Sequence, residues 1–525
     1  MPSYSKFLKH VFGGGWATDY GPTAFVSPDV SGKVVIPWLN EAQNCIYELD
    51  GGPHKAPGCT LNTSALESGA DIMGVFDAWF SGAVGTPVQH RTLNVGTKIK
   101  KDNADDTFTD LFTGMTAGAV PCYTMFEDLL IISNDSGTDV PKSWDGTTAQ
   151  SLAGTPPTFA FSIVHKNRCW AAGAVAAPSR LYYSVSLTGA DWVGAGSGSI
   201  DIDPSDSDRI TGLVSFRNDL FVFKGPYKGS IHRITGSAPT GTDAFAKIPF
   251  ANGVGAVNHA SIVPYANDVA FIWSDGSIRT IATSVNFGDF EQAALSREIK
   301  SWIRDHVNLP ALRFAQATNW PDRDSILFAL PIDASTSNNI LLAMDYRFTP
   351  PRFSPWTSFT FATSLGSAVS LAPSKQRTVL AGGTDGKLRT LGSPTRTIDT
   401  STGISANIQT PYLDYDIPHR MKTIEGASVT LNPKTSGNIV FGWTRDTNAQ
   451  QTVSLGQGGT AVLDTFVLDT DRLGGGRFND VYTRLGEEGG EFRAIQYQVL
   501  DNVAGQDLEL HAISADITVG AQSYE

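Results

Sequence analysis

The chain is poor in charge and in long apolar runs. Charged residues make up 17% of its 525 residues. No apolar run approaches the roughly 20 residues that a membrane-spanning helix needs, so we expect no transmembrane segment. The first 15 residues also lack the apolar stretch of a signal peptide. We therefore expect a protein that is not secreted.

Cysteine is scarce as well. The four cysteines, Cys45, Cys59, Cys122 and Cys169, form no CxxC pair and show no metal-ligand spacing. Four cysteines could pair as two disulfides. In a chain of this size without a signal peptide, however, free thiols are the interpretation we favour.

Familiar catalytic and metal-binding motifs are absent from the sequence. It contains no HExxH, Walker-type, G-x-S-x-G or G-x-G-x-x-G motif, and no two of its nine histidines stand at i and i+4. His165 and His232 fall in or beside expected strands, which favours structural roles. We predict no catalytic, cofactor-binding or metal-binding residues, no cofactor and no enzymatic activity. A pair of catalytic carboxylates has no sequence signature, so a glycosidase remains an alternative.

One acidic segment invites a metal hypothesis. Residues 201–208 contain four aspartates and resemble part of a calcium loop. They lack the glycine at position six and the glutamate at position twelve of such a loop, so we favour a solvated turn between strands. A weaker set comprises Asp464, Asp469 and Asp471.

The formal net charge of −13 argues against a general nucleic-acid binder, which needs a basic face. An acidic surface remains compatible with a channel through which DNA passes without sticking.

The chain is rich in glycine (52) and proline (28), which suits short strands and tight turns. One pattern recurs: a polar turn, a short apolar strand, a glycine-containing turn and a second strand, as in residues 218–236. Copies begin near residues 127, 167, 218, 267, 324 and 376. Their spacing of roughly 40–57 residues overlaps that of four-stranded propeller blades.

The repeat predicts an all-β protein, because radial repetition buries both faces of each sheet and leaves only short edges. We predict a β-propeller of about six or seven blades over residues 39–412. The turns at 274–276 and 384–386 contain Asp-Gly and lack the Trp of a sialidase Asp-box, so we interpret them as hairpin turns.

Three segments depart from the repeat. Residues 1–38 are expected to form an N-terminal arm packed on a surface. Within residues 290–306, Leu295, Ile299 and Trp302 recur at helical spacing, which predicts a helical insertion in one blade. The repeat disappears near residue 413, and strand patterns after it predict a β-sandwich-like domain at 413–525.

A series of phrases within residues 178–256 comes in a characteristic order. It includes Pro178–Ser184 and Arg209–Leu213, then Asn218–Lys224 and Ile231–Gly236. This order resembles the β-propeller tail nozzle (tail tube, or hub) proteins of short-tailed bacteriophages. The turn at 51–58 resembles a first-blade turn of that group. The resemblance covers about residues 40–300.

The resemblance implies a structural protein of the phage virion, assembled in the cytoplasm of the bacterial host. Such proteins form homo-oligomeric rings, commonly hexamers, below the portal and the adaptor (neck) protein. Their channel conducts and gates the genomic DNA during ejection, and tail fibres or spikes dock on their outside. Two alternatives remain: a propeller that binds or cleaves glycans, such as a glycosidase or depolymerase, and an adhesion or scaffold propeller.

Overall fold

In a computed structural model, the chain divides into two compact units of interleaved segments. Unit 1 comprises residues 1–60, 342–358 and 392–525, and unit 2 comprises residues 61–341 and 359–391. The structure describes residues 4–29, 31–67, 69–82, 87–103, 107–287, 294–369, 376–432, 437–446, 448–456, 479–485 and 490–520.

Unit 2 is a β-propeller whose sheets follow one another along the chain. The first three consist of β8 (Ile72–Ser81), β9 (Pro87–Val95), β10 (Lys98–Asp102) and β11 (Phe108–Phe112); β12 (Pro121–Phe126), β13 (Leu129–Asn134), β14 (Lys142–Trp144) and β15 (Ala149–Ser151); and β16 (Phe161–His165), β17 (Arg168–Ala172), β18 (Arg180–Tyr183) and β19 (Gly198–Asp201). The fourth and fifth consist of β20 (Arg209–Phe216), β21 (Asp219–Gly225), β22 (Ser230–Thr235) and β23 (Ala246–Asn252); and β24 (Val263–Tyr265), β25 (Asp268–Ile272) and β26 (Ile278–Thr280). The sixth begins with β27 (Gln316–Trp320) and β28 (Ser325–Leu330), and the seventh with β31 (Ala362–Val369), β32 (Arg377–Gly383) and β33 (Leu388–Ser393).

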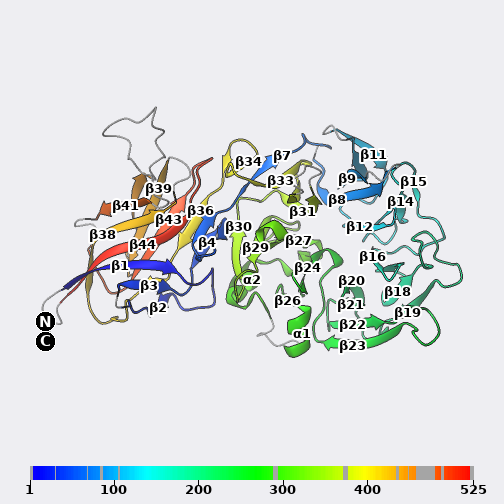
Figure 1. Ribbon diagram of the computed structural model, residues 1–525, viewed down its shortest axis with the longest axis horizontal. Helices are drawn as coiled ribbons and strands as arrows, with labels where there is room; N and C mark the ends of the chain where they lie inside the picture. Colours follow the sequence, from blue (N-terminus) through cyan, green and yellow to red (C-terminus); the bar gives the residue numbers. More distant parts are fainter. Residues whose placement is uncertain are drawn as a thin grey trace. The chain divides into compact units, whose positions relative to one another are not determined.

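The first strand of each sheet lies innermost, and these strands surround a common centre (Figure 1). Neighbouring inner strands contact one another: β8 contacts β12, β12 contacts β16, and β16 contacts β20. In the same way β24 contacts β27, and β27 contacts β31. Apolar side chains fill the space between adjacent sheets: Trp170 and Leu181 of the third pack with Leu213 and Val222 of the fourth. Each sheet therefore buries both faces against its neighbours, as the repeat predicted.

The ring closes between the last sheet and the first. Strand β31 contacts β8, and Ile72 and Val75 share an apolar cluster with Leu380 and Leu388. The backbone N–H of Asn62 also donates to the carbonyl of Leu388 over 2.9 Å. Residues before the first sheet thus pair with the last one. The propeller prediction is confirmed, with seven sheets among the described residues.

The helical insertion differs from its prediction. Its C-terminal part is helical as predicted, in η3 (Arg297–Ile299) and α2 (Lys300–His306), and α1 (Ile281–Phe287) precedes it. The other short 3-10 segments are η1 (His259–Ser261), η4 (Leu309–Phe314) and η5 (Pro321–Arg323). Leu295, expected in a helix, instead donates its N–H to the Ile278 carbonyl, and Ser296 Oγ accepts from Ile278 N–H. This segment therefore follows the edge of β26 before a helix can begin. Residues 288–293 lie outside the described residues.

Unit 1 contains two large sheets and several short strands. One sheet has the order β3 (Lys33–Ile36), β1 (Tyr4–Phe12), β44 (Leu510–Val519), β38 (Lys422–Leu431) and β41 (Asn479–Arg484), with β42 (Glu491–Phe492) on β38. The other has the order β2 (Thr23–Ala24), β37 (Tyr412–Leu413), β43 (Ile495–Asp501), β36 (Ala406–Gln409) and β4 (Glu41–Gln43), with β39 (Asn438–Arg445) on β43 and β40 (Gln451–Gly456) on β39. The remaining strands are β5 (Cys45–Tyr47), β6 (Pro53–Lys55), β7 (Gly58–Leu61), β30 (Arg352–Trp356), β34 (Thr397–Ile398) and β35 (Thr402–Gly403), and β29 (Ile340–Asp345) crosses the unit boundary.

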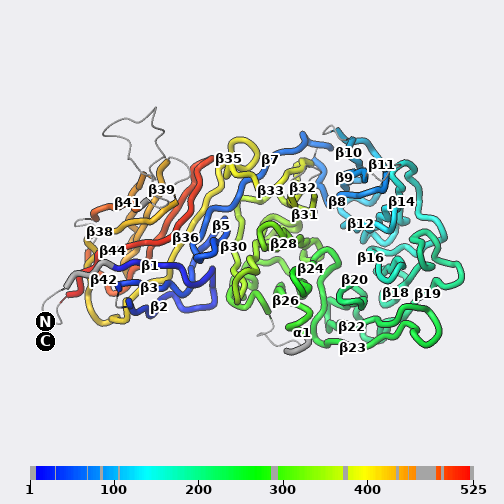
Figure 2. The backbone as a smooth tube through the Cα atoms, viewed as in Figure 1, coloured from blue at the N-terminus to red at the C-terminus, as the bar shows by residue number. Residues whose placement is uncertain are grey.

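The predicted domain boundaries are wrong at four places. Residues 1–38 are not an arm, because β1 pairs with β44 in antiparallel and with β3 in parallel register (Figure 2). Residues 39–60, 342–358 and 392–412 belong to unit 1 and not to the propeller. The sandwich-like domain therefore draws on both ends of the chain. Pairing between strands about 500 residues apart leaves no local signal in the sequence.

A chain of hydrogen bonds crosses the interior of the sandwich. His10 in β1 has a fully buried side chain, and its Nδ1 lies 2.9 Å from the carbonyl oxygen of Ile513. Its Nε2 lies 3.0 Å from the Tyr415 hydroxyl, which lies 3.0 Å from the Tyr497 hydroxyl. A neutral imidazole satisfies this arrangement: Nδ1–H donates to the carbonyl, and Nε2 accepts from Tyr415.

Acid should weaken unit 1 through His10. Burial lowers the pKa of His10 to about 4, against an ordinary 6.5, although the bond to Ile513 opposes this shift. The unfolded chain therefore takes up a proton first, and stability is lost as pH falls from 6.5 towards 4. We expect His10 to contribute a loss on the order of 2 kcal/mol by about pH 5. Urea titrations near neutrality and near pH 5 would show a smaller loss for His10→Gln, and an equal loss would contradict the assignment.

The four cysteines are free thiols, as predicted, and Cys45, Cys59 and Cys169 are buried. Among the described residues, no helix has the length and apolarity to span a bilayer.

Candidate functional site

The acidic segment 201–208 is bonded to a side chain of the protein itself. Lys224 in β21 has a fully buried side chain. Its Nζ donates to the carbonyls of Ile202 (2.7 Å) and Asp203 (2.8 Å) and to the Asp206 carboxylate (2.6 Å). The ammonium thus bonds oxygens that the calcium hypothesis would assign to a metal ion. The segment is a turn whose inner side is closed by Lys224.

The other polar residues considered from the sequence have structural partners. The Asp208 carboxylate accepts three backbone N–H bonds, from residues 227–229. His165 Nδ1 lies 2.8 Å from Ser215 Oγ, and His232 Nε2 lies 3.0 Å from Ser230 Oγ. Asp464, Asp469 and Asp471 lie outside the described residues. The His165 bond joins β16 to β20, whereas the His232 bond stays within β22.

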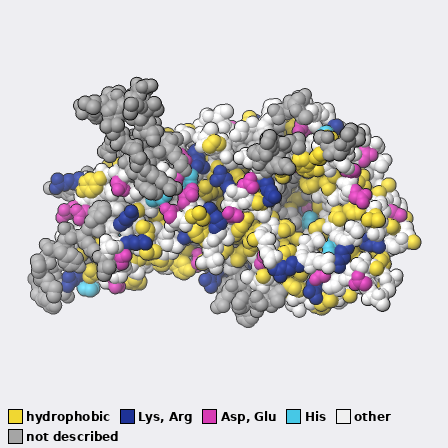
Figure 3. All heavy atoms as spheres, viewed as in Figure 1, with side chains coloured by type: hydrophobic (Ala, Val, Ile, Leu, Met, Phe, Trp, Pro, Cys, Tyr) yellow, Lys and Arg dark blue, Asp and Glu magenta, His cyan; other side chains and the backbone are white. Residues whose placement is uncertain are grey.

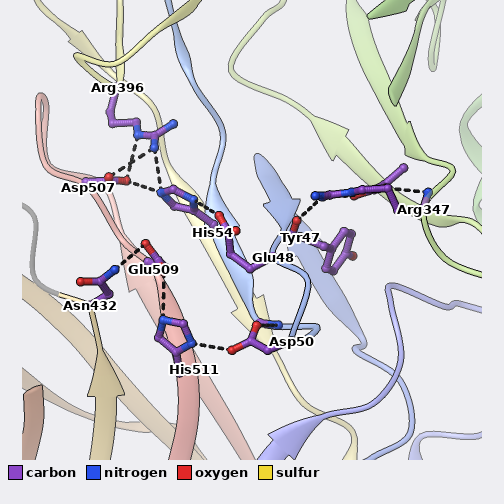
Figure 4. Close-up of polar contacts among 12 residues, drawn as sticks. Tyr47, Glu48, Asp50, His54, Arg347, Arg396, Asn432, Asp507, Glu509 and His511 are labelled. Carbon is purple, nitrogen blue, oxygen red and sulfur yellow. Dashed lines mark hydrogen bonds and ion pairs between the residues drawn. The ribbon is translucent and has the colours of Figure 1, made fainter. Parts of the chain in front are cut away.

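A second polar cluster, in unit 1, was missed by the sequence analysis. It is built from the β5–β6 hairpin and from the segment that enters β44 (Figure 4). The hairpin turns at Gly51, where φ is +91° and a Cβ would lie 2.4 Å from the Phe12 carbonyl oxygen, so only glycine fits. His54 and Glu509 then form an isolated antiparallel bridge. The turn at 51–58 thus lies in unit 1 and not in a first blade.

His54 lies at the centre of this cluster. Its Nδ1 lies 2.8 Å from Glu48 Oε1, and its Nε2 lies 2.8 Å from Asp507 Oδ1 and 2.7 Å from Arg396 Nη2. The His54 side chain is 5% exposed, whereas that of Glu48 is 37% exposed. The cluster is therefore buried at the histidine and reaches solvent at Glu48.

A second histidine lies beside it. His511 Nδ1 lies 2.7 Å from Asp50 Oδ2, and its Nε2 lies 3.0 Å from Glu509 Oε1. The other oxygen of Glu509 accepts a hydrogen bond from the Asn432 amide over 3.0 Å. Each imidazole thus lies between two carboxylates, and Glu509 is held from two sides.

Asp507 carries a stable negative charge. Burial raises the pKa of its carboxyl, but the hydrogen bond and charge of His54 and the paired guanidinium of Arg396 outweigh burial and hold the pKa well below its usual range. Arg396 Nε lies 2.8 Å from Asp507 Oδ1. Asp507 is therefore an acceptor that can orient the His54 ring at any pH near neutrality.

Three side chains of the cluster have the chemistry and proximity of metal ligands. Glu48, His54 and Glu509 each offer one ligand atom, and these atoms lie within 4.8 Å of one another. Among the described residues, no other group of three or more His, Cys, Asp or Glu meets this criterion. Sequence spacing could not reveal the set, because Glu509 follows His54 by more than 450 residues. The only local signal was the Gly-Gly turn before His54.

A pocket of about 150 Å³ lies in unit 2 where β12, β16 and β20 begin. The Phe161 and His259 rings stack in it with centroids 4.9 Å apart, and burial lowers the pKa of His259 to about 4. Asp135 is the one carboxylate among its lining residues, beside Arg209 and Arg313. A glycosidase of the ordinary kind needs two carboxylates, and this pocket supplies one.

Comparison with known proteins found no matching family model and no matching curated protein. Among solved structures, the chain is similar to one described as YCF48 bound to D1 peptide, with 11% identity and a TM-score of 0.39 over 66% of this chain and 98% of that one. It is also similar to YCF48 from Cyanidioschyzon merolae, with 9% identity and a TM-score of 0.36 over 62% of this chain and 96% of that one. At these identities we take neither a partner nor an activity from the YCF48 structures.

Proposed function

We propose that the chain is a structural subunit of the tail of a short-tailed bacteriophage, a ring-forming nozzle or tube protein below the portal and adaptor. One observation carries the proposal. The phrases that resemble this group fall on strands of the third and fourth propeller sheets: 178–184 on β18, 209–213 on β20, 218–224 on β21 and 231–236 on β22. The phrases that resemble the tail nozzle proteins therefore lie on strands of two adjacent propeller sheets, in chain order.

The charge of the protein suits a DNA conduit. The net charge is −13, and among the described residues on the face drawn in Figure 3 acidic and basic side chains are interspersed without a basic stripe. A channel lined by a negative potential repels phosphate, so DNA would pass without binding. In this function the protein conducts and gates the genome and offers its outer surface to tail fibres.

A ring requires complementary surfaces on each subunit. Cyclic symmetry uses heterologous interfaces, so two different faces of one chain must be complementary. Ring formation therefore separates the proposal from a monomeric glycan-binding propeller or glycosidase and from an adhesion or scaffold propeller.

Mass in solution tests the proposal. We expect the purified chain, alone or mixed with phage portal and adaptor proteins, to form a discrete ring of about six times its 56.1-kDa mass. Mass photometry over a dilution series measures this directly, and an unrelated monomeric propeller is the control. A chain that remains monomeric with the neck proteins present would contradict the proposal, and glycan binding and hydrolysis assays would then follow.

A further inference from the structure

We infer that Glu48, His54 and Glu509 form a binding site for a divalent transition-metal ion, for which zinc is a suitable probe. The inference concerns unit 1 alone and does not rest on the proposed tail function. One imidazole nitrogen and two carboxylate oxygens are a ligand set that zinc accepts. The site would keep a coordination position for water, as sites with three protein ligands do.

The geometry needs only small side-chain movements. Zinc lies about 2.0–2.2 Å from nitrogen and oxygen ligands, so tetrahedral ligand atoms are about 3.4 Å apart. His54 Nδ1 and Glu48 Oε1 are already 2.8 Å apart, and no pair of the three ligand atoms exceeds 4.8 Å. Glu48 is the most exposed of the three and can move to complete the set.

The surroundings match those of known metal sites. A metal-bound histidine usually donates its other N–H to a carboxylate, and ligating carboxylates are themselves hydrogen-bonded. Here Asp507 Oδ1 lies 2.8 Å from His54 Nε2, the nitrogen opposite the ligand atom. The Asn432 amide binds one oxygen of Glu509. Both arrangements orient ligands before any ion arrives.

The charge balance also favours a cation. Four carboxylates, on Glu48, Asp50, Asp507 and Glu509, bond the two histidines of the cluster. Arg396 is paired with Asp507. On binding, the ion takes the place of the hydrogen between His54 Nδ1 and Glu48, and that proton leaves to solvent.

Such an ion would join segments distant in the chain. Glu48 and His54 flank the β5–β6 hairpin turn, and Glu509 precedes β44, the last described strand. A ligand that binds the folded state alone raises stability. Bound zinc should therefore raise the unfolding temperature of unit 1.

Equilibrium dialysis of the full chain against zinc, with the bound metal quantified after prior EDTA treatment, tests the site. We expect one zinc per chain and a rise in unfolding temperature. Glu48→Gln keeps the size of the side chain and an acceptor for His54, and it should weaken zinc binding about tenfold or more. Glu509→Gln should do the same. The matched control is His306→Ala, because His306 and Asp333 form an exposed histidine–carboxylate pair 2.9 Å apart.

Each outcome of these experiments either supports or overturns the zinc site. Zinc binding by wild type and by His306→Ala, with loss in Glu48→Gln, supports the site when Glu48→Gln unfolds like wild type in EDTA. No zinc bound by wild type at neutral pH would overturn the site. Zinc binding as tight as that of wild type in both Glu48→Gln and Glu509→Gln would overturn it too. Loss of zinc binding in His306→Ala would also overturn it. Oligomeric mass plays no part in these readouts, so they are independent of the ring proposal.

Discussion

Lys224→Met is expected to lower the free energy of unfolding of the propeller by about 3–5 kcal/mol, because it leaves buried oxygens without their cation. Lys224 Nζ bonds the carbonyls of Ile202 and Asp203 and the Asp206 carboxylate, and the lysine side chain is fully buried. Methionine has a similar length and cannot donate a hydrogen bond. The loss can be measured by urea unfolding followed by tryptophan fluorescence.

Lys247→Met is the matched control. Lys247 also pairs with Asp203, but the side chains are 30% and 45% exposed. Exposed pairs contribute about 0–1 kcal/mol, so this variant should unfold almost like wild type. Equal effects of the two substitutions would show that the buried ammonium is not what holds the turn at 201–208.

Asp501→Ala is expected to destabilise unit 1 by a similar amount, about 3–5 kcal/mol. Lys55 Nζ lies 3.2 Å from Asp501 Oδ2 and donates to the Val503 carbonyl over 3.0 Å. Both side chains are 0% exposed. Burial lowers the pKa of Lys55 and raises that of Asp501, which shows how poorly each charge is solvated. Removing one partner leaves the other charge buried and uncompensated.

The double variant Lys55→Met/Asp501→Leu distinguishes the charge effect from lost packing. Replacing a buried pair by apolar residues is often neutral, so the double variant should recover most of the stability that Asp501→Ala loses. Asp305→Ala, which breaks the exposed pair with Arg304, should change stability by less than about 1 kcal/mol. A double variant as unstable as Asp501→Ala would show that the unpaired charge of Lys55 does not cause the loss.

The local pattern was sufficient to predict the propeller. The apolar run Leu220–Phe223 between polar turns forms β21, in which every residue but Asp219 is buried. A short continuous apolar run bounded by turn residues is typical of a strand buried on both faces, so the strand could be predicted although its residues do not alternate. The Asp-Gly turns are hairpin turns as predicted: Gly276 and Gly386 have φ of +81° and +69°. The helical insertion was placed less well, since Leu295 follows the edge of β26, a contact that helical spacing cannot foresee.

The candidate metal site could not be predicted in this way. Its ligands come from a hairpin at residues 48–54 and from Glu509, which the bridge between His54 and Glu509 brings together. Likewise, nothing near residues 201–208 indicates that Lys224 would close the turn. Both sites are made by side chains whose neighbours in space are not neighbours in sequence.

The amino-acid sequence by itself determined the strand repeat, its turns and hence the all-β propeller, because periodicity and turn chemistry act over a few residues. The tertiary structure decided where the units begin and end, what fills the acidic turn and which residues surround His54. It placed β1 beside β44, with Lys9 opposite Ser514. Such pairing depends on burying the apolar faces of the whole chain at once, and no local stretch of sequence contains that information.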